Sequence, residues 1–431
     1  MRIAIIHHHL HPGGVTRIIE SQVNSLYSLG NCELTIHTGE LPQYFSVNEA
    51  VAPVFVSEFL QYLPADLSGE MMQDRFQKIV RYLDEVAGHH DILHVHNLNL
   101  GKNPLLTLAV YQLAKQGVVV INHCHDFAED RPQNHAFLNA VIQDFFREKL
   151  SDVLYPPLSN YHYLVLTSQE HKRLSTYGVN QNRISLLPNP VTFSVNINKQ
   201  LHKEMITGSL GINHALKICL YPVRAIHRKN IGEFILLSVL FRDRASWLIT
   251  QAPQNPLEIP EYKRWKEFCR TYNIPVVFEA GNKIDIYDLM PAVDFCITTS
   301  IREGFGMAFM EPWLAGTPVI GRNLENCTTD MIRNGMRFSL LYDRFSVTFK
   351  GEKKDFGHLN PQQQQQIIKD VIIEPGIKEE IYALNDFLKK FLEPVKQEII
   401  TYNQLVIHEK YSPENYGKEL HGIYQKLSGR A

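Results

Sequence analysis

Two stretches of alternating strand-like and helix-like segments constrain this chain of 431 residues more than any other feature. The first opens with apolar residues 3–6 and an amphipathic segment over 15–29, and it ends near Leu187. The second opens at Leu216–Tyr221, after a polar stretch over 191–214. Such alternation builds parallel sheets through right-handed crossovers. We therefore expect an α/β protein with two doubly wound domains that face each other.

Charge, cysteine and hydropathy patterns exclude several classes of protein. Lys and Arg number 43 against 45 Asp and Glu, so the net charge of −2 offers no broad basic surface for nucleic acid. None of the 6 cysteines forms a CxxC pair, which suits free thiols in a reducing compartment. No run approaches the roughly 18 apolar residues of a membrane span. We expect a cytoplasmic protein without an integral membrane segment, with peripheral membrane contact left open.

Ligands of open α/β sheets bind beyond the carboxyl ends of the strands, and four such ends carry unusual residues. The first is residues 7–14, HHHLHPGG. The double glycine lets backbone approach a ligand, and the next helix start offers N–H groups that suit a phosphate. A tight strand-to-helix turn explains it equally well, and nothing fixes the four histidines in the geometry of a metal site. The dinucleotide fingerprint GxGxxG is absent.

The second strand end is His123-Cys124-His125-Asp126, after the β-branched run from Val118. If the strand continues, alternation places His123 and His125 on one side of the sheet. A histidine there can bond a sugar hydroxyl or stabilise developing charge. A buried histidine bonded to backbone is an equal alternative.

The third strand end is residues 221–230, YPVRAIHRKN. Arg224 and Lys229 lie between a strand end and a helix start, where two cations and the helix dipole suit a diphosphate. A solvated basic turn is the alternative.

The fourth strand end is residues 300–316, SIREGFGMAFMEPWLAG. Gly304 and Gly306 flank a bend that opens a helix expected over 307–315. Glu303 and Glu311 can accept hydrogen bonds from the paired hydroxyls of a sugar or ribose. The apolar residues of this segment suit a core position better than a ligand contact.

Glu303-Gly304-Phe305-Gly306…Glu311 resembles the E-x7-E signature of retaining glycosyltransferases with two Rossmann-like domains facing across a cleft, the GT-B fold, and of its family-4 group. Further matches follow in the family's order, at Gly13–Gly14, His125–Asp126, Leu187-Pro188-Asn189-Pro190 and Arg224…Lys229. The resemblance implies an N-terminal, acceptor-side domain over 1–195, a linker over 196–214 and a donor-side domain over 215–400. It also implies that a C-terminal helix within 401–431 crosses back to the first domain.

The resemblance implies a role for each matching residue. Arg224 and Lys229 would grip the donor diphosphate and neutralise the leaving group. Glu303 would bind the transferred sugar, Glu311 the ribose, and His125 would lie near the donor sugar. The implied catalytic residues are Glu303, His125, Lys229 and Arg224. The implied donor-binding residues are Gly14, Arg224, Lys229, Gly304, Phe305, Gly306, Met307, Ala308 and Glu311.

The activity implied is transfer of a hexose from a UDP-, GDP- or ADP-sugar to an acceptor hydroxyl, with retention of configuration and with neither cofactor nor bound metal. Partners would be the nucleotide sugar and a carbohydrate or small hydroxylated acceptor. The sequence departs from the family at Asn230, where glycine is common, and at Pro312–Trp313, where residues are usually smaller. A sugar phosphorylase on the same fold and a non-catalytic nucleotide-sugar-binding protein remain alternatives.

Overall fold

The computed structural model describes residues 1–40, 45–193 and 199–429. The chain divides into two compact units, which are described separately. The N-terminal unit comprises residues 1–190 and 411–431, and the C-terminal unit comprises residues 191–410.

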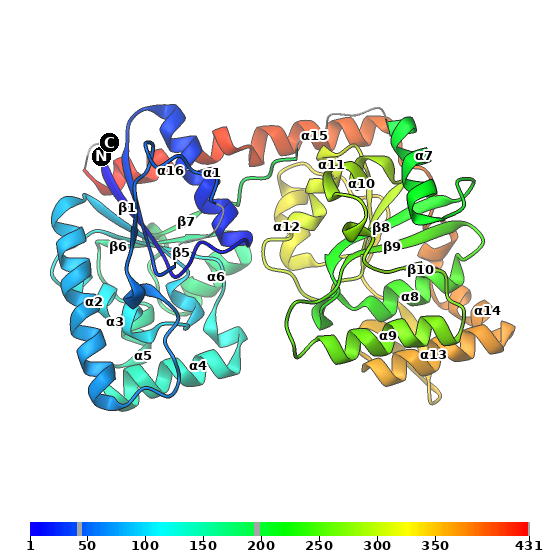
Figure 1. The fold of residues 1–431 in the computed structure, drawn as a ribbon, viewed down its shortest axis with the longest axis horizontal. Helices are drawn as coiled ribbons and strands as arrows, with labels where there is room; N and C mark the ends of the chain where they lie inside the picture. The colour runs from blue at the N-terminus through cyan, green and yellow to red at the C-terminus, as the bar shows by residue number, and fades with distance from the viewer. Residues whose placement is uncertain (41–44, 194–198, 430–431) are drawn as a thin grey trace. The chain divides into compact units, whose positions relative to one another are not determined.

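A parallel sheet forms the centre of the N-terminal unit (Figure 1). Its strands, in spatial order, are β3 (Val54–Val56), β2 (Glu33–Thr38), β1 (Arg2–His7), β4 (Ile92–His96), β5 (Val120–Cys124), β6 (Tyr161–Val165) and β7 (Ile184–Leu186). Its helices are α1 (Gly14–Leu29), α2 (Gly69–His89), α3 (Pro104–Lys115), α4 (Pro132–Leu138), α5 (Leu150–Leu154), α6 (Ser168–Thr176) and α16 (Pro413–Leu427). Strand order reverses direction at β1, as in doubly wound sheets.

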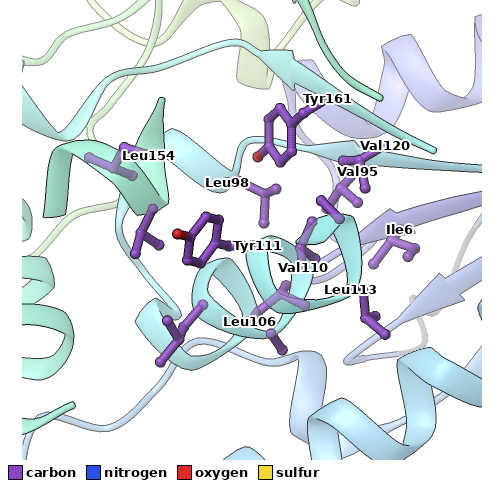
Figure 2. Close-up of a cluster of buried hydrophobic side chains, with 14 of the residues drawn as sticks. Ile6, Val95, Leu98, Leu106, Val110, Tyr111, Leu113, Val120, Leu154 and Tyr161 are labelled. Atoms are coloured by element: carbon purple, nitrogen blue, oxygen red, sulfur yellow. The ribbon is translucent and has the colours of Figure 1, made fainter. Parts of the chain in front are cut away.

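Helices cover both faces of this sheet, because successive strand residues point to opposite sides. Ile3 and Ile5 of β1 pack in one layer with α1 and α16, while Ala4 and Ile6 pack in the other with α2, α3 and α5. Figure 2 shows side chains of the second layer, among them Val110 of α3. The strand-like run ending at Cys124 is buried on both faces, as its composition predicts.

The C-terminal unit repeats this plan. The spatial order of its parallel sheet is β10 (Val276–Val277), β9 (Ala245–Gln251), β8 (Lys217–Arg224), β11 (Phe295–Thr298), β12 (Val319–Arg322) and β13 (Leu341–Tyr342). The hairpin strands are β14 (Ser346–Phe349) and β15 (Glu352–Asp355). The helices are α7 (Lys199–Leu210), α8 (Ile231–Leu240), α9 (Ile259–Thr271), α10 (Ile286–Ala292), α11 (Glu311–Leu314), α12 (Glu325–Arg333), α13 (Pro361–Ile373), α14 (Pro375–Leu384) and α15 (Gln397–Tyr411). Two doubly wound units confirm the expected fold class.

Residues expected as a linker over 196–214 contain helix α7, so the expectation of irregular structure there is wrong. Ile206 of α7 is fully buried in a cluster with Leu289 and Met290 of α10, and this burial stabilises a helix in a polar sequence. The remaining part of the expected boundary, residues 194–198, lies outside the described residues.

The helix expected over 307–315 is also wrong in part. Met307–Phe309 form a 3₁₀ turn, and α11 begins only at Glu311. Pro312 at the second position of α11 has no N–H group, so a continuous helix would lose a hydrogen bond there.

The C-terminal segment consists of two helices separated at Ser412. The Ser412 hydroxyl accepts from the Asn415 backbone N–H at 3.2 Å and caps α16. Tyr416 and Leu420 of α16 pack with Ile19 of α1 in the N-terminal unit. Within the described residues, no helix combines the length and apolar composition needed to cross a membrane.

A buried ionic cluster joins three elements of the C-terminal unit beside the loop 224–230. The Arg322 guanidinium on β12 donates to both carboxylate oxygens of Glu233 on α8, at 2.9 and 2.5 Å. It also donates to both oxygens of Asp355, at 2.9 and 2.7 Å. Glu233 has no exposed side-chain surface, so its charge depends on Arg322 for compensation.

We predict that Arg322→Met destabilises the C-terminal unit by about 3–5 kcal/mol, because it leaves two carboxylates buried without their cation. Urea unfolding followed by tryptophan fluorescence measures this unit alone, since Trp247, Trp265 and Trp313, the chain's 3 tryptophans, all lie in it. The control Arg270→Met breaks an exposed pair with Glu267 and should leave the midpoint unchanged. Equal midpoints for both variants would contradict the role of the cluster.

Candidate functional site

The loop after β8 is held in a tight conformation by Asn230. This residue adopts φ 48° and ψ 53°, the left-handed region, which asparagine tolerates better than most residues. Its amide donates to Glu233 Oε2 at 3.0 Å, and its amide oxygen accepts from Gln364 of α13 at 2.9 Å. These bonds explain why asparagine serves where the family commonly has glycine.

Glu303 is the centre of the polar contacts at this end of the sheet. Its Oε1 accepts from Lys229 Nζ and, at 2.6 Å, from the Ser300 hydroxyl, while its Oε2 accepts from Arg228 at 2.7 Å. The Glu303 side chain is 8% exposed and that of Lys229 is 12% exposed. Tyr221 supports the group, because its hydroxyl donates to the Lys229 carbonyl and lies 2.8 Å from Ser300 Oγ. The carboxylate is therefore bound on both oxygens and largely dry.

Burial and charge act in opposite directions on this pair. Burial alone would raise the pKa of Glu303, but Lys229 and Arg228 outweigh it, and the pKa lies below its ordinary value. Burial and the neighbouring Arg228 together lower the pKa of Lys229 by more than Glu303 raises it. A second anion near Lys229 would favour its charged form, so this ammonium group is suited to a phosphate ligand.

The glycine bend has steric reasons for its composition. Gly306 has φ 84°, and a Cβ there would lie 2.8 Å from Cys327 Cβ of α12. Cys327 Sγ also donates to the Gly304 carbonyl at 3.3 Å, and Asn326 Nδ2 donates to the Glu303 carbonyl at 3.2 Å. Helix α12 therefore fixes the backbone on which Glu303 stands.

The structure brings together some of the predicted residues. Lys229 and Glu303 are in direct contact, and Glu311 begins α11 two residues after the 3₁₀ turn that follows Gly306. Arg224 is exposed, and its Nε donates to Gln251 Oε1 at 3.3 Å. Its role at a diphosphate stays a prediction.

Two partners of Glu303 were not assigned a role from the sequence. Arg228 is there only one residue of the basic turn over 221–230, and Ser300 is only the start of a motif. The signal that could have found Arg228 is its position beside Lys229 in a loop that must turn sharply at Asn230. No sequence pattern around Ser300 predicts its hydrogen bond to Glu303.

The glycine loop of the N-terminal unit leaves the start of α1 without a side-chain cap. Gly13 is the N-cap residue and makes no such bond, and a Cβ on Gly14 would meet no atom within 4 Å. The N–H groups at this helix start suit an anion. The roles of Gly14 and His125 in donor binding stay predictions.

The histidines of residues 7–11 have separate partners. His8 Nδ1 lies 3.0 Å from the Leu60 carbonyl, His9 Nε2 lies 3.1 Å from the Tyr62 hydroxyl, and His11 pairs with Glu40. Burial lowers the pKa of His8 to about 4. These contacts favour hydrogen bonding over joint ligation of a metal.

Elsewhere in the described part of the chain, one histidine group is close enough to share a metal ion, and it consists of His94, His96 and His123. The His94 and His96 rings stack at 4.7 Å with planes 21° apart, and the His96 and His123 rings lie 4.9 Å apart at 33°. A metal binds in the plane of an imidazole ring, so the stacked rings of His94 and His96 do not direct their nitrogens at one point. This arrangement fits hydrogen bonding better than ligation.

Comparison with known proteins supports the fold and the general class. No protein-family model matches the sequence. The chain is 27% identical over 392 residues to mannosylglucosyl-3-phosphoglycerate synthase of Petrotoga mobilis, covering 86% of this chain and 73% of that protein. It is similar in structure to Anabaena HepE in complex with UDP and glucose, with a TM-score of 0.63 and 14% identity over 99% of this chain and 100% of that one.

Sucrose-phosphate synthase from Thermosynechococcus elongatus gives the same TM-score of 0.63, with 16% identity and 100% of both chains covered. The chain has the GT-B fold. The expectation drawn from the E-x7-E resemblance is confirmed at this level. The GT-B relatives and the named homologue together support a glycosyltransferase.

We predict a pH-dependent stabilisation by Glu303. Glu303→Gln should lower the free energy of unfolding at pH 7 by about 1–3 kcal/mol, because a buried charged group loses its partner. The folded-state pKa of Glu303 is lowered, so its contribution is full above the ordinary carboxyl value near about 4.3 and is lost as pH falls through the folded value. The free energies of unfolding of wild type and variant, measured from urea curves by tryptophan fluorescence, should converge as the pH falls from 7 to 3.

A difference in unfolding free energy between wild type and variant that stays constant down to pH 3 would contradict the predicted pH dependence. The control Glu267→Gln removes an exposed partner of Arg270 and should follow the wild-type curve throughout.

Proposed function

We propose that this protein is a retaining, metal-independent hexosyltransferase of the family-4 type, which moves a hexose from a UDP-, GDP- or ADP-sugar to an acceptor hydroxyl. The observation that carries the proposal is the dry contact of Glu303 with Lys229 beside the glycine bend of a GT-B fold. A carboxylate and an ammonium group of this kind, beside the backbone N–H groups of a glycine bend, suit a sugar bonded to a diphosphate.

In this proposal the cations serve the leaving group. The donor phosphate takes the position next to Lys229 and shares that ammonium group with Glu303, while Arg224 turns from Gln251 toward the second phosphate. Positive charge placed where the phosphate becomes negative lowers the barrier to departure without a metal. The backbone of Gly306–Ala308 contributes N–H groups at the start of the 3₁₀ turn.

Two carboxylates would accept hydrogen bonds from hydroxyl groups of the donor. Glu303 is ionised and held on both oxygens, so it can accept from a hydroxyl of the transferred sugar without moving far. Glu311 would accept from the ribose. With retention of configuration, the acceptor attacks from the face that the phosphate leaves, and a donor phosphate oxygen receives the acceptor proton.

The named relative narrows the substrates of the proposal. Because that protein is described as a mannosylglucosyl-3-phosphoglycerate synthase, we propose mannose as the hexose and a glucoside of an acidic three-carbon compound as the acceptor. None of the six cysteines, Cys32 through Cys327, forms a disulfide among the described residues, which supports a cytoplasmic location. A thermal-shift panel of UDP-, GDP- and ADP-sugars that includes GDP-mannose tests the donor, since a bound ligand raises the melting temperature.

The alternatives have separate assays. A phosphorylase would form sugar phosphate from disaccharide and inorganic phosphate, and a transferase would not. A binding protein would bind a nucleotide sugar tightly without slow donor hydrolysis or transfer.

We predict that Lys229→Ala lowers kcat/KM for transfer by about 100-fold or more, because the leaving phosphate loses a preorganised cation. Glu303→Ala should abolish turnover as well. Initial rates from a radiolabelled nucleotide sugar measure both, and circular dichroism verifies folding. The control Lys389→Ala removes a solvent-exposed lysine paired with Asp386 and should keep full activity. Full activity of Lys229→Ala would refute the assignment.

We also predict that excess EDTA leaves the initial rate unchanged and that the product has the anomeric configuration of the donor. Proton NMR of the product distinguishes the two anomers by the coupling constant of the anomeric hydrogen. An inverted product, or a rate restored only by added Mg²⁺ or Mn²⁺, would contradict this part of the proposal.

A further inference from the structure

Four buried histidines form a column on the α1 and α16 face of the N-terminal sheet. His94 and His96 lie two residues apart on β4, so they share one face of the sheet. His123 lies on β5 and His125 follows directly after that strand, again two residues apart. His96 is the register partner of His123. The rings of His123 and His125 lie 4.3 Å apart, so the sequence expectation that they share a side is confirmed. The column ends at His125, the residue proposed to lie near the donor sugar.

Gln22 of α1 determines where the hydrogens lie in one half of this column. Its amide oxygen lies 2.9 Å from His96 Nε2, and an amide oxygen only accepts, so His96 Nε2 carries hydrogen. In a neutral ring His96 Nδ1 is then bare, and it accepts from His125 Nε2 at 2.9 Å. His125 therefore carries its hydrogen on Nε2, and its Nδ1 is bare.

The amide nitrogen of Gln22 faces Tyr424 of α16 and His94. It donates to the Tyr424 hydroxyl at 2.9 Å and lies 3.2 Å from His94 Nδ1. Because an amide nitrogen only donates, His94 Nδ1 is bare, and it also accepts from the Tyr424 hydroxyl at 2.7 Å. His94 Nε2 then carries hydrogen and donates to His123 Nδ1 at 3.2 Å. The same orientation of one amide therefore sets the tautomer of every ring in the column.

All four rings have the Nε2–H tautomer, and all four are neutral. Burial lowers the pKa of His125 to about 4, although Asp126 acts in the opposite direction, and burial lowers the pKa of His94 to about 3. Burial also holds the pKa of His96 and of His123 well below the ordinary value. The titratable groups that face His125 are His7 on β1, His94 and His96 on β4, His123 on β5, and Asp126 next in the chain.

The backbone of His125 is fixed as well. Asn97 Oδ1 accepts from the N–H groups of His125 and Asp126 at 3.3 and 2.9 Å. Among the residues that the structure describes, none bonds to His125 Nδ1, and the residue is 9% exposed. A bare nitrogen with a fixed direction is left for an external donor.

We propose that Gln22, whose amide nitrogen donates to Tyr424 and His94, is a positioning residue that keeps His125 in the Nε2–H tautomer so that its Nδ1 accepts a hydrogen bond from a sugar hydroxyl. This inference deepens the proposed function and rests on it. The opposite tautomer would present an N–H group, which would turn the hydroxyl around and direct its hydrogen elsewhere.

Four variants test the proposal. Gln22→Met keeps the side-chain length and removes both hydrogen-bonding atoms, while Gln22→Glu keeps the acceptor toward His96. Tyr424→Phe removes one of the two partners of the Gln22 amide nitrogen and loosens its orientation, and it serves if Gln22→Met fails to fold. The matched control is Tyr416→Phe on the same helix, because the buried Tyr416 hydroxyl makes no hydrogen bond among the described residues.

Nitrogen-15 NMR of histidine-labelled protein reports the tautomer directly, with the His125 signals identified by their loss in His125→Asn. We expect Nε2–H in wild type, in Gln22→Glu and in Tyr416→Phe, and a mixture of tautomers in Gln22→Met and Tyr424→Phe. Nδ1–H at His125 in wild type, or an unchanged tautomer in Gln22→Met and Tyr424→Phe, overturns the proposal.

Kinetics report the link to catalysis. We expect Gln22→Met to lower kcat/KM by about three- to tenfold, the effect of one hydrogen bond, and Tyr416→Phe to leave it unchanged. Gln22→Glu should retain activity, with the acidic limb of its pH profile moved to higher pH because a carboxylate favours imidazolium. A changed tautomer with unchanged kcat/KM and pH profile overturns the role in catalysis. If wild type transfers no sugar, the proposed function fails, and the NMR result alone decides whether Gln22 sets the tautomer.

Discussion

The polar end of the C-terminal sheet depends on one constraint, which is that a nearly dry carboxylate must be compensated. Glu303 is 8% exposed, so it stays ionised only because Lys229 and Arg228 lie on its two oxygens. Lys229 is placed by a loop that turns at Asn230, and Asn230 is in turn held by Glu233 and by α13. The cluster around Arg322 therefore also supports the loop that carries Lys229, because it holds Glu233. Arg322 thus compensates Glu233 in the core, and Lys229 and Arg228 compensate Glu303 nearer the surface.

Elements with strong local signals could be predicted from the sequence, and those that depend on distant partners could not. Period-two alternation placed His123 and His125 on one side, and the spacing of Gly304 and Gly306 indicated a bend that Gly306 confirms at φ 84°. Helix α7 was missed because its stability comes from burial of Ile206 against α10 and its composition resembles a linker. The bond between Gln22 and Tyr424 spans 402 residues, and no local pattern indicates it.

The candidate site was predictable to a similar depth. Lys229 and Glu303 could be named because cations and acids at strand ends point to chemistry, and the structure places them in contact. Ser300 and Tyr221 could not, because their importance is a matter of which hydroxyl faces which oxygen. For Arg224, the sequence position alone did not predict the side-chain contact. Its position in the chain suits a diphosphate, yet in the structure its guanidinium bonds to Gln251.

The two units use different physical means to prepare for a polar ligand. In the C-terminal unit the means is the charge of side chains. Salt and pH change the strength of their interactions, and an incoming phosphate can take over part of these contacts. In the N-terminal unit the histidines are neutral, so the information lies in the positions of hydrogens. Such a pattern is indifferent to salt and, above the lowered pKa values, to pH. It also directs a single lone pair, which a mobile charge does not do. In the proposed reaction, charge in one unit would therefore suit the departing phosphate, and a fixed tautomer in the other would suit the orientation of a hydroxyl.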